Sequence, residues 1–285
     1  PLKRTRGIIK ILAAALIFAV GFGVLFYPVF SDLWNQNRQN QLIHSYEEKA
    51  QQLSQADYSA WLETARAYND ALSPSFGDAF KGRQPEEDDP YWSLLDLEGT
   101  GVMGYLEIPR LGLRLPIYHG TGESALQQGI GHLAGTSLPI GGTGYHTVLS
   151  GHRGLPSAHL FTDLDQMEIG DRFYLCILGR RLAYETDRIT VVEPDQVEEL
   201  LPVEGEDLAT LVTCTPYGVN THRLLVRGRR VEETPQEEAP QVTVVQQVTH
   251  SLGWKGWLLA GVLAAFLLGL LVLLIVRLAR RKKRG

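Results

Sequence analysis

The segment TLVTCTPYGVNTHRLLVRG, residues 210–228, decides how this chain is interpreted. Its apolar, β-branched beginning is typical of a strand, and Pro216 with the Gly and Asn that follow it predicts a turn. Cys214 therefore stands at the end of one strand, and Arg223 lies on the next. A thiol in this position is a buried residue, half of a disulfide, a metal ligand or a nucleophile.

The two cysteines of the chain lie in different surroundings. Cys176 is enclosed by the apolar sequence FYLCIL, where a small buried residue is expected. A domain of this length does not need a disulfide for stability. The chain has no C-x₂-C or H-x₃-H spacing, so a metal site is not indicated. Position alone leaves Cys214 as either a structural residue or a nucleophile.

A nucleophilic thiol needs a base or a cation beside it, because an unassisted cysteine is mostly protonated at neutral pH. His152 ends the alternating segment HTVLSGHRG and is a second residue at a strand end, so it could meet Cys214 at one rim; a surface histidine has the same spacing. The planar guanidinium of Arg223 could hold an oxyanion or a substrate carbonyl, or simply be solvated.

The central part of the chain, residues 101–232, reads as β structure. Gly179 and Arg180 predict a hairpin turn. Residues 158–167 and 194–201 resemble short helices that connect strands. A closed barrel or a sandwich is expected from this many short strands. The predicted strands are 102–108, 113–118, 145–151, 172–178, 181–192, 208–214 and 222–231.

The sequences on either side of this region differ in composition. Residues 31–72 predict an extracellular helical segment, because from residue 35 they lack Pro and Gly and carry apolar side chains at helical spacing. Residues 73–100 contain three prolines and four consecutive acids, which indicates a long loop that acts as a lid or is disordered. Residues 233–253, rich in Pro, Gln and Glu, predict a linker.

Two apolar runs predict membrane-spanning helices at residues 11–30 and 254–276, each with about the 20 residues that a bilayer requires. A cleaved signal peptide is the alternative for the first run. Lys and Arg are abundant in residues 1–10 and 277–285, and such residues favour the cytoplasmic side. We therefore expect a two-pass protein of the cell membrane, in contact with lipid, with both termini cytoplasmic and the catalytic domain extracellular.

Three segments resemble one family. The segment 210–228 resembles the active-site segment of class C sortases, the pilus-building enzymes of Gram-positive bacteria. Residues 147–171 and 104–121 resemble the histidine segment and the opening strands of the same enzymes. The resemblance implies the eight-stranded sortase β-barrel, an all-β fold with helical additions, here flanked by the two predicted membrane helices. It also implies His152, Cys214 and Arg223 as catalytic residues.

The sequence DPYW at residues 89–92 resembles the lid motif of class C sortases. The resemblance implies that Asp89, Pro90 and Tyr91 close the active site, with Asp89 facing the arginine and Tyr91 covering the thiol. An acidic linker is the alternative interpretation. Thr213 and Thr215, which flank the cysteine, are candidate substrate-binding residues.

The reaction that the resemblance implies is transpeptidation. A pilin with an LPXTG-type sorting signal is cleaved between Thr and Gly, and the resulting thioester is passed to a lysine amine of another pilin. No metal, organic cofactor or nucleic acid is implied. A housekeeping-type sortase that joins surface proteins to a cell-wall precursor, a thiol protease and a non-enzymatic tether are the alternatives.

Overall fold

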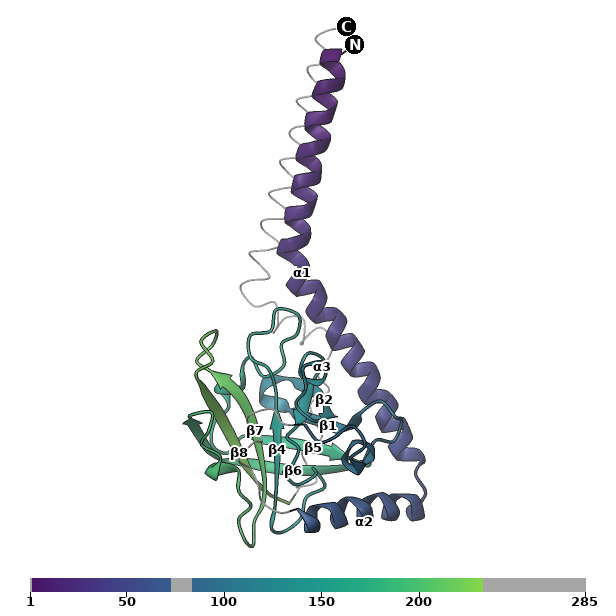
Figure 1. Cartoon of the computed structure of the whole chain (residues 1–285), viewed down its shortest axis with the longest axis vertical. Coiled ribbons are helices and arrows are strands. Elements are labelled where there is room, and N and C mark those ends of the chain that lie inside the picture. The colour runs from purple at the N-terminus through teal and green to yellow at the C-terminus, as the bar shows by residue number, and fades with distance from the viewer. Residues whose placement is uncertain (1, 73–83, 233–285) are drawn as a thin grey trace. The chain divides into compact units, whose positions relative to one another are not determined.

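The structure is a computed structural model that describes residues 2–72 and 84–232 (Figure 1). The chain divides into two compact units, Pro1–Glu238 and Ala239–Gly285, and the described residues all belong to the first. The predicted linker, the second predicted membrane helix and the basic tail, together residues 233–285, lie outside the described residues.

Eight strands of the described chain form a closed barrel (Figure 1) in the order β1-β2-β3-β4-β7-β8-β6-β5. Closure leaves no strand edge unpaired. Neighbours pair antiparallel, except that β2 pairs parallel with β3 and β4 pairs parallel with β7. The strands are β1 (Val102–Ile108), β2 (Leu113–His119), β3 (Ile130–His132), β4 (Tyr145–Ser150), β5 (Arg172–Ile177), β6 (Arg180–Val192), β7 (Asp207–Thr215) and β8 (His222–Arg230).

Alternation along the strands separates two apolar clusters. The interior cluster includes Leu149 of β4 and Leu211 of β7, together with most of the buried core. Their neighbours in sequence, Val148 and Val212, point to the opposite side and pack with Leu200 from the segment between β6 and β7. This outer cluster matters for the site because residues at every second position beyond it, including Cys214, share its side of the sheet.

Two long helices precede the barrel, α1 (Leu2–Gln52) and α2 (Gln55–Ala71). The helix predicted up to residue 72 is thus interrupted, and Ser54 caps α2 by accepting a hydrogen bond from the Asp57 amide. Tyr46 fastens α1 to the barrel, since its hydroxyl donates to the Met103 carbonyl at 2.8 Å and accepts from the Leu178 amide at 3.0 Å.

The remaining helical elements are short. The residues predicted as helices at 158–167 and 194–201 contain only single 3₁₀ turns, because loop contacts rather than helical hydrogen bonds hold most of these segments. The short elements are η2 (Pro90–Ser93), η3 (Pro109–Leu111), α3 (Glu123–Leu126), η4 (Leu164–Gln166) and η5 (Glu198–Leu200).

The predicted membrane topology is wrong. Residues 11–30 belong to α1, and within residues 2–72 and 84–232 no helix has the length and apolarity needed to cross a membrane. The charge-free run is one part of a 51-residue helix that continues into a polar half in contact with the barrel. The two-pass localisation, with its membrane-lipid partner, is therefore contradicted.

Gly104 is expected to be irreplaceable in the bulge of β1. Its φ is +158°, and an added Cβ would lie 2.6 Å from the backbone oxygen of Cys176. Gly104→Ala should lower the free energy of unfolding by about 1–3 kcal/mol, because the strand pairing must shift. Chemical denaturation measures this. Gly122→Ala is the control, since its Cβ meets nothing within 4 Å, and an equal loss in both variants would contradict the prediction.

Candidate active site

A pocket of about 180 Å³ lies at the end of β7 and contains the three residues that the sequence singled out. His152, Cys214 and Arg223 all line it, although they come from three separate segments of the chain. Apolar side chains from the outer cluster contribute to its walls. The full lining is Thr121, Leu126, Leu133, Val148, Ser150, Gly151, His152, Val212, Thr213, Cys214 and Arg223.

Strand register explains why these residues meet. Ser150 of β4 lies opposite Val212 of the parallel strand β7, and the Gly151 amide continues the pairing by donating to the Val212 carbonyl at 3.0 Å. Parallel register advances one residue at a time on both strands, so the chain that leaves β4 runs toward Cys214, and His152 and Cys214 line the same pocket. On the other side, antiparallel pairing places Arg223 of β8 directly opposite Cys214.

Cys214 and Cys176 are both free thiols but differ in surroundings. Cys214 is partly exposed at the pocket. Cys176 is buried, as predicted, and burial, together with the nearby Glu107 carboxylate, raises the pKa of its thiol to about 12. Cys176 is therefore held as the neutral thiol at physiological pH, and the accessible sulfur of the described chain that could act as a nucleophile is that of Cys214.

The guanidinium of Arg223 is fixed to its own hairpin. Its Nη1 donates to the carbonyl oxygens of Asn220 at 3.3 Å and His222 at 3.1 Å. Asn220 has a left-handed backbone, with φ of +62°, which turns its carbonyl toward the arginine side of the loop. The side chain is thereby held beside the pocket that it lines.

The threonines beside the cysteine bond to the protein itself. Thr213 is buried, and its hydroxyl donates to the carbonyl of Gly151 at 2.8 Å. The hydroxyl of Thr215 accepts from Nη1 of Arg153 at 3.2 Å. Both bonds connect the residues next to Cys214 with the residues next to His152. The role of these threonines in substrate binding stays a prediction.

The residues of the predicted lid lie apart from this pocket's lining. The Asp89 carboxylate accepts from the Tyr91 amide at 2.8 Å and so caps η2. Tyr91 is completely buried, and its hydroxyl lies 2.9 Å from Nδ1 of His132 and accepts from the Gly120 amide at 2.8 Å. In the described structure this segment is thus anchored through Tyr91 to the ends of β2 and β3. A lid function stays a prediction.

Sequence reasoning did not single out Arg153. Its side chain is only 8% exposed, although it follows His152 directly in a segment that reads as a loop. Besides Thr215, it contacts Asp165 and the ring of Tyr217. The only signal in the sequence was its adjacency to the histidine, because its partners lie far along the chain.

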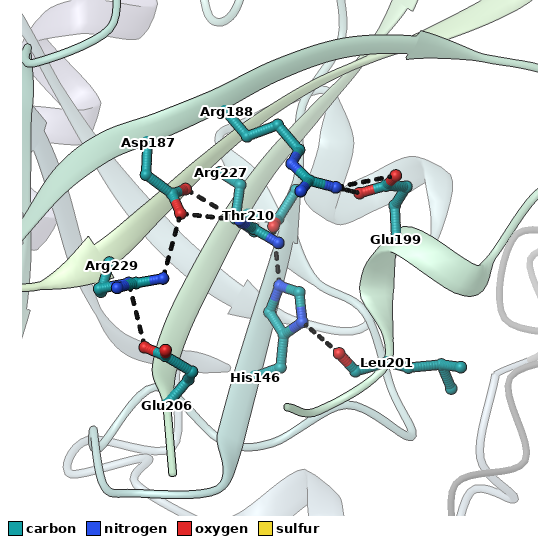
Figure 2. Close-up of polar contacts among 9 residues, drawn as sticks. All are labelled: His146, Asp187, Arg188, Glu199, Leu201, Glu206, Thr210, Arg227 and Arg229. Carbon is teal, nitrogen blue, oxygen red and sulfur yellow. Dashed lines mark hydrogen bonds and ion pairs between the residues drawn. The ribbon is translucent and has the colours of Figure 1, made fainter. Parts of the chain in front are cut away.

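A second pocket of about 380 Å³ lies at the opposite end of β7 and β8. Figure 2 shows the polar contacts of its arginines. Three arginines surround it and each pairs with a carboxylate. Arg227 makes two hydrogen bonds to Asp187, at 3.0 and 2.7 Å, and the other pairs are Arg188 with Glu199 and Arg229 with Glu206. These pairs connect β6 and β8 with each other and with the segment between β6 and β7.

His146 connects that segment to β7 (Figure 2). Its Nδ1 bonds to the Leu201 carbonyl at 3.0 Å, and its Nε2 bonds to the Thr210 hydroxyl at 2.7 Å. The carbonyl requires an N–H on Nδ1, so a neutral ring with Nε2 as acceptor satisfies both contacts. Leu200, one residue away, packs against Val148 and Val212 of the catalytic pocket. The contacts of His146 and the arginine–carboxylate pairs therefore support a wall of the pocket that contains Cys214.

Comparison with known proteins agrees with this arrangement of a strand-end thiol enzyme on a β-barrel. A model of the sortase domain matches residues 106–231. The solved structure of sortase C1 from Streptococcus agalactiae is 43% identical, with a TM-score of 0.62, and the match covers 68% of this chain and 99% of that one. Sortase C-1 from Streptococcus pneumoniae is 41% identical, with a TM-score of 0.63 and coverage of 68% and 100%.

Among curated relatives, Sortase D of Bacillus subtilis is 30% identical over 131 residues. That match covers 45% of this chain and 63% of the relative, so the chain spans just under two thirds of its length. The chain belongs to the sortase family of cysteine transpeptidases, and its structural neighbours are class C sortases. The family inferred from the sequence motifs is therefore confirmed.

Acid should destabilise the barrel through two buried histidines. Burial lowers the pKa values of His132 and His146 from 6.5 to about 4. Between pH 4 and pH 6.5 the unfolded chain binds more protons than the folded chain. The contribution of each histidine to folding stability is therefore fully present above pH 6.5 and is lost as the pH falls toward 4. Each histidine contributes a slope of at most about 1.4 kcal/mol per pH unit.

Denaturation with urea between pH 7 and 4 measures this slope. His146→Gln retains one donor and one acceptor but does not titrate, so its slope should be smaller than that of the wild-type protein by about the share of one histidine. Equal slopes in the two proteins would contradict the assignment of a neutral, buried His146.

The predicted lid has a direct test in the reactivity of Cys214. Asp89→Ala removes the cap of η2 and should loosen the segment that carries Tyr91. If this segment restricts access to the thiol, alkylation of Cys214 in the full chain should become faster. Ser93→Ala, in the same turn, is the matched control. An alkylation rate unchanged in Asp89→Ala would mean that the segment is structural.

Proposed function

We propose that this chain is a pilin-joining transpeptidase that cleaves an LPXTG-type sorting signal between Thr and Gly and transfers the acyl group to a lysine amine of another pilin. The pocket that unites His152, Cys214 and Arg223 carries the proposal. The class of substrate is supported by the similarity to class C sortases, one of which, from Streptococcus pneumoniae, is described with respect to pilin substrate specificity.

In the first step the sulfur of Cys214 attacks the carbonyl carbon of the Thr–Gly bond. The tetrahedral intermediate carries a negative oxygen, which the guanidinium of Arg223 stabilises by charge and hydrogen bonding. The imidazolium of His152 gives a proton to the glycine amine as the C–N bond breaks. The products of this step are a thioester on Cys214, a neutral His152 and a released peptide.

In the second step a lysine amine attacks the thioester carbonyl. His152 accepts a proton from the attacking nitrogen, the C–S bond breaks and the new isopeptide bond forms. The enzyme returns to its starting protonation state after both steps. The thioester conserves the free energy of the cleaved amide, so the proposed cycle requires no nucleotide.

The position of Arg223 suits this role. It lies directly across the strand pair from Cys214, and its Nη1 is committed to loop carbonyls. The planar group is therefore oriented before the substrate arrives, which reduces the cost of reorganisation in the transition state. A lysine ammonium cannot hold the loop carbonyls and an oxyanion in the same geometry.

The proposed reaction is tested by incubating the full chain with an LPXTG-containing donor peptide and a lysine-containing acceptor peptide. We expect a cross-linked product and, by mass spectrometry, a transient acyl adduct on Cys214. Cys214→Ala should abolish both, Arg223→Lys should lose most of the turnover, and Cys176→Ala should leave the adduct in place. Product formed without Cys214 would refute the mechanism, and hydrolysis without transfer would indicate a thiol protease.

A further inference from the structure

The guanidinium of Arg153 lies between the segment that carries His152 and the segment that carries Cys214. Its side chain is 8% exposed, whereas the carboxylate of its partner Asp165 is 49% exposed. The arginine is therefore directed into the protein, and its ion pair occupies only the outer end of the group. We propose that Arg153, through Thr215, is a positioning residue that sets the separation of the catalytic histidine and cysteine.

On the histidine side, Arg153 closes the base of the loop that follows β4. Its Nε donates to the Thr162 carbonyl at 3.2 Å, and its Nη2 pairs with Asp165. The backbone reinforces this closure, because the Phe161 amide donates to the His152 carbonyl at 3.1 Å. The residue that carries the imidazole is thus tied at its carbonyl and, through the next residue, at a side chain.

On the cysteine side, the same guanidinium reaches the residue directly after the nucleophile. Nη1 donates to the Thr215 hydroxyl at 3.2 Å. The ring of Tyr217 lies over the guanidinium, 5.9 Å from its carbon to the ring centroid. The same ring also leaves no room above Gly154, where an added Cβ would come within 2.9 Å. The two loops are therefore interlocked at residues 153–154 and 215–217.

The contact between Arg153 and Thr215 controls the positions of His152 and Cys214 and not their charge. Because side chains alternate along a strand, Thr215 points to the opposite face from Cys214. Its hydroxyl therefore contacts Arg153 on the side of the strand away from the thiol. The strands themselves end at Ser150 and Thr215, so His152 lies beyond the last residue that β4 hydrogen bonding fixes. Arg153 supplies a contact between the two segments beyond the end of β4, where His152 needs a defined distance from Cys214. A displacement of about 1 Å at a reacting group can cost about 100-fold in rate.

Thr215→Val is the discriminating variant, because it removes the hydroxyl and leaves the charge of Arg153 unchanged. This inference rests on the proposed function, so kcat and KM are measured for the full chain in the transpeptidation assay. We expect kcat to fall by about 10- to 100-fold with KM unchanged. Thr215→Ser keeps the hydroxyl and should restore the rate. Arg153→Gln should resemble Thr215→Val, and the double variant should be no worse than Arg153→Gln.

Arg172→Gln is the matched control, because it removes an arginine–carboxylate pair between β5 and β6, and neither Arg172 nor its partner Glu185 lines the pocket. Its kcat should equal that of the wild-type protein. A normal kcat in folded Thr215→Val, with an active wild-type enzyme, would overturn the positioning role; so would a loss that Thr215→Ser does not restore. An inactive wild-type protein would instead refute the proposed function, so the two failures are distinguishable.

Discussion

The parallel pairing of β4 with β7 is the constraint on which the rest of the site depends. It brings the end of the histidine strand beside the end of the cysteine strand, in a register that runs from Tyr145 opposite Asp207 to Ser150 opposite Val212. A slip of one residue would turn Cys214 from the outer face toward the barrel interior, since side chains alternate between the two faces. The interior packing of Leu149 and Leu211 prevents that slip.

The support of the pocket extends along the whole length of β7. At its near end, hydroxyl groups on both sides of Cys214 bond to the histidine segment. At its far end, the arginine–carboxylate pairs and His146 hold the chain between β6 and β7. Leu200 connects the two ends, because it packs in the outer cluster that also lines the pocket. The pocket is thus supported by contacts at both ends of β7.

Local patterns in the sequence predicted the barrel well, because most of its strands are long enough to alternate. The first predicted strand, 102–108, coincides with β1. β3 was missed, since three residues, Ile130–His132, carry no readable period. The predicted connecting helices failed for a related reason, because segments held by side-chain and loop contacts have no helical period of their own. The prediction for the charge-free run at 11–30 was wrong, because no helix among the described residues has the length and apolarity needed to cross a membrane.

The active site was harder to predict from local sequence patterns than the strands were. Residue chemistry and the family resemblance selected His152, Cys214 and Arg223, and the structure brings all three to one pocket. Tyr91 packs against the rings of Tyr68, His119 and His132, which come from separate segments of the chain. The role of Arg153 could not be predicted from the sequence, because it depends on a contact with Thr215, which is 62 residues away.

The long separation between β4 and β7 also has a consequence for how the chain acquires its chemistry. β5 and β6 are made between them, yet these strands pair on the other side of the barrel, and β8 must arrive before Arg223 faces Cys214. Contacts of such large sequence separation are slow to form, because closing a long loop costs entropy. An incompletely synthesised or collapsed chain therefore carries an ordinary cysteine, and its capacity for acyl transfer appears only when the last strand closes the ring.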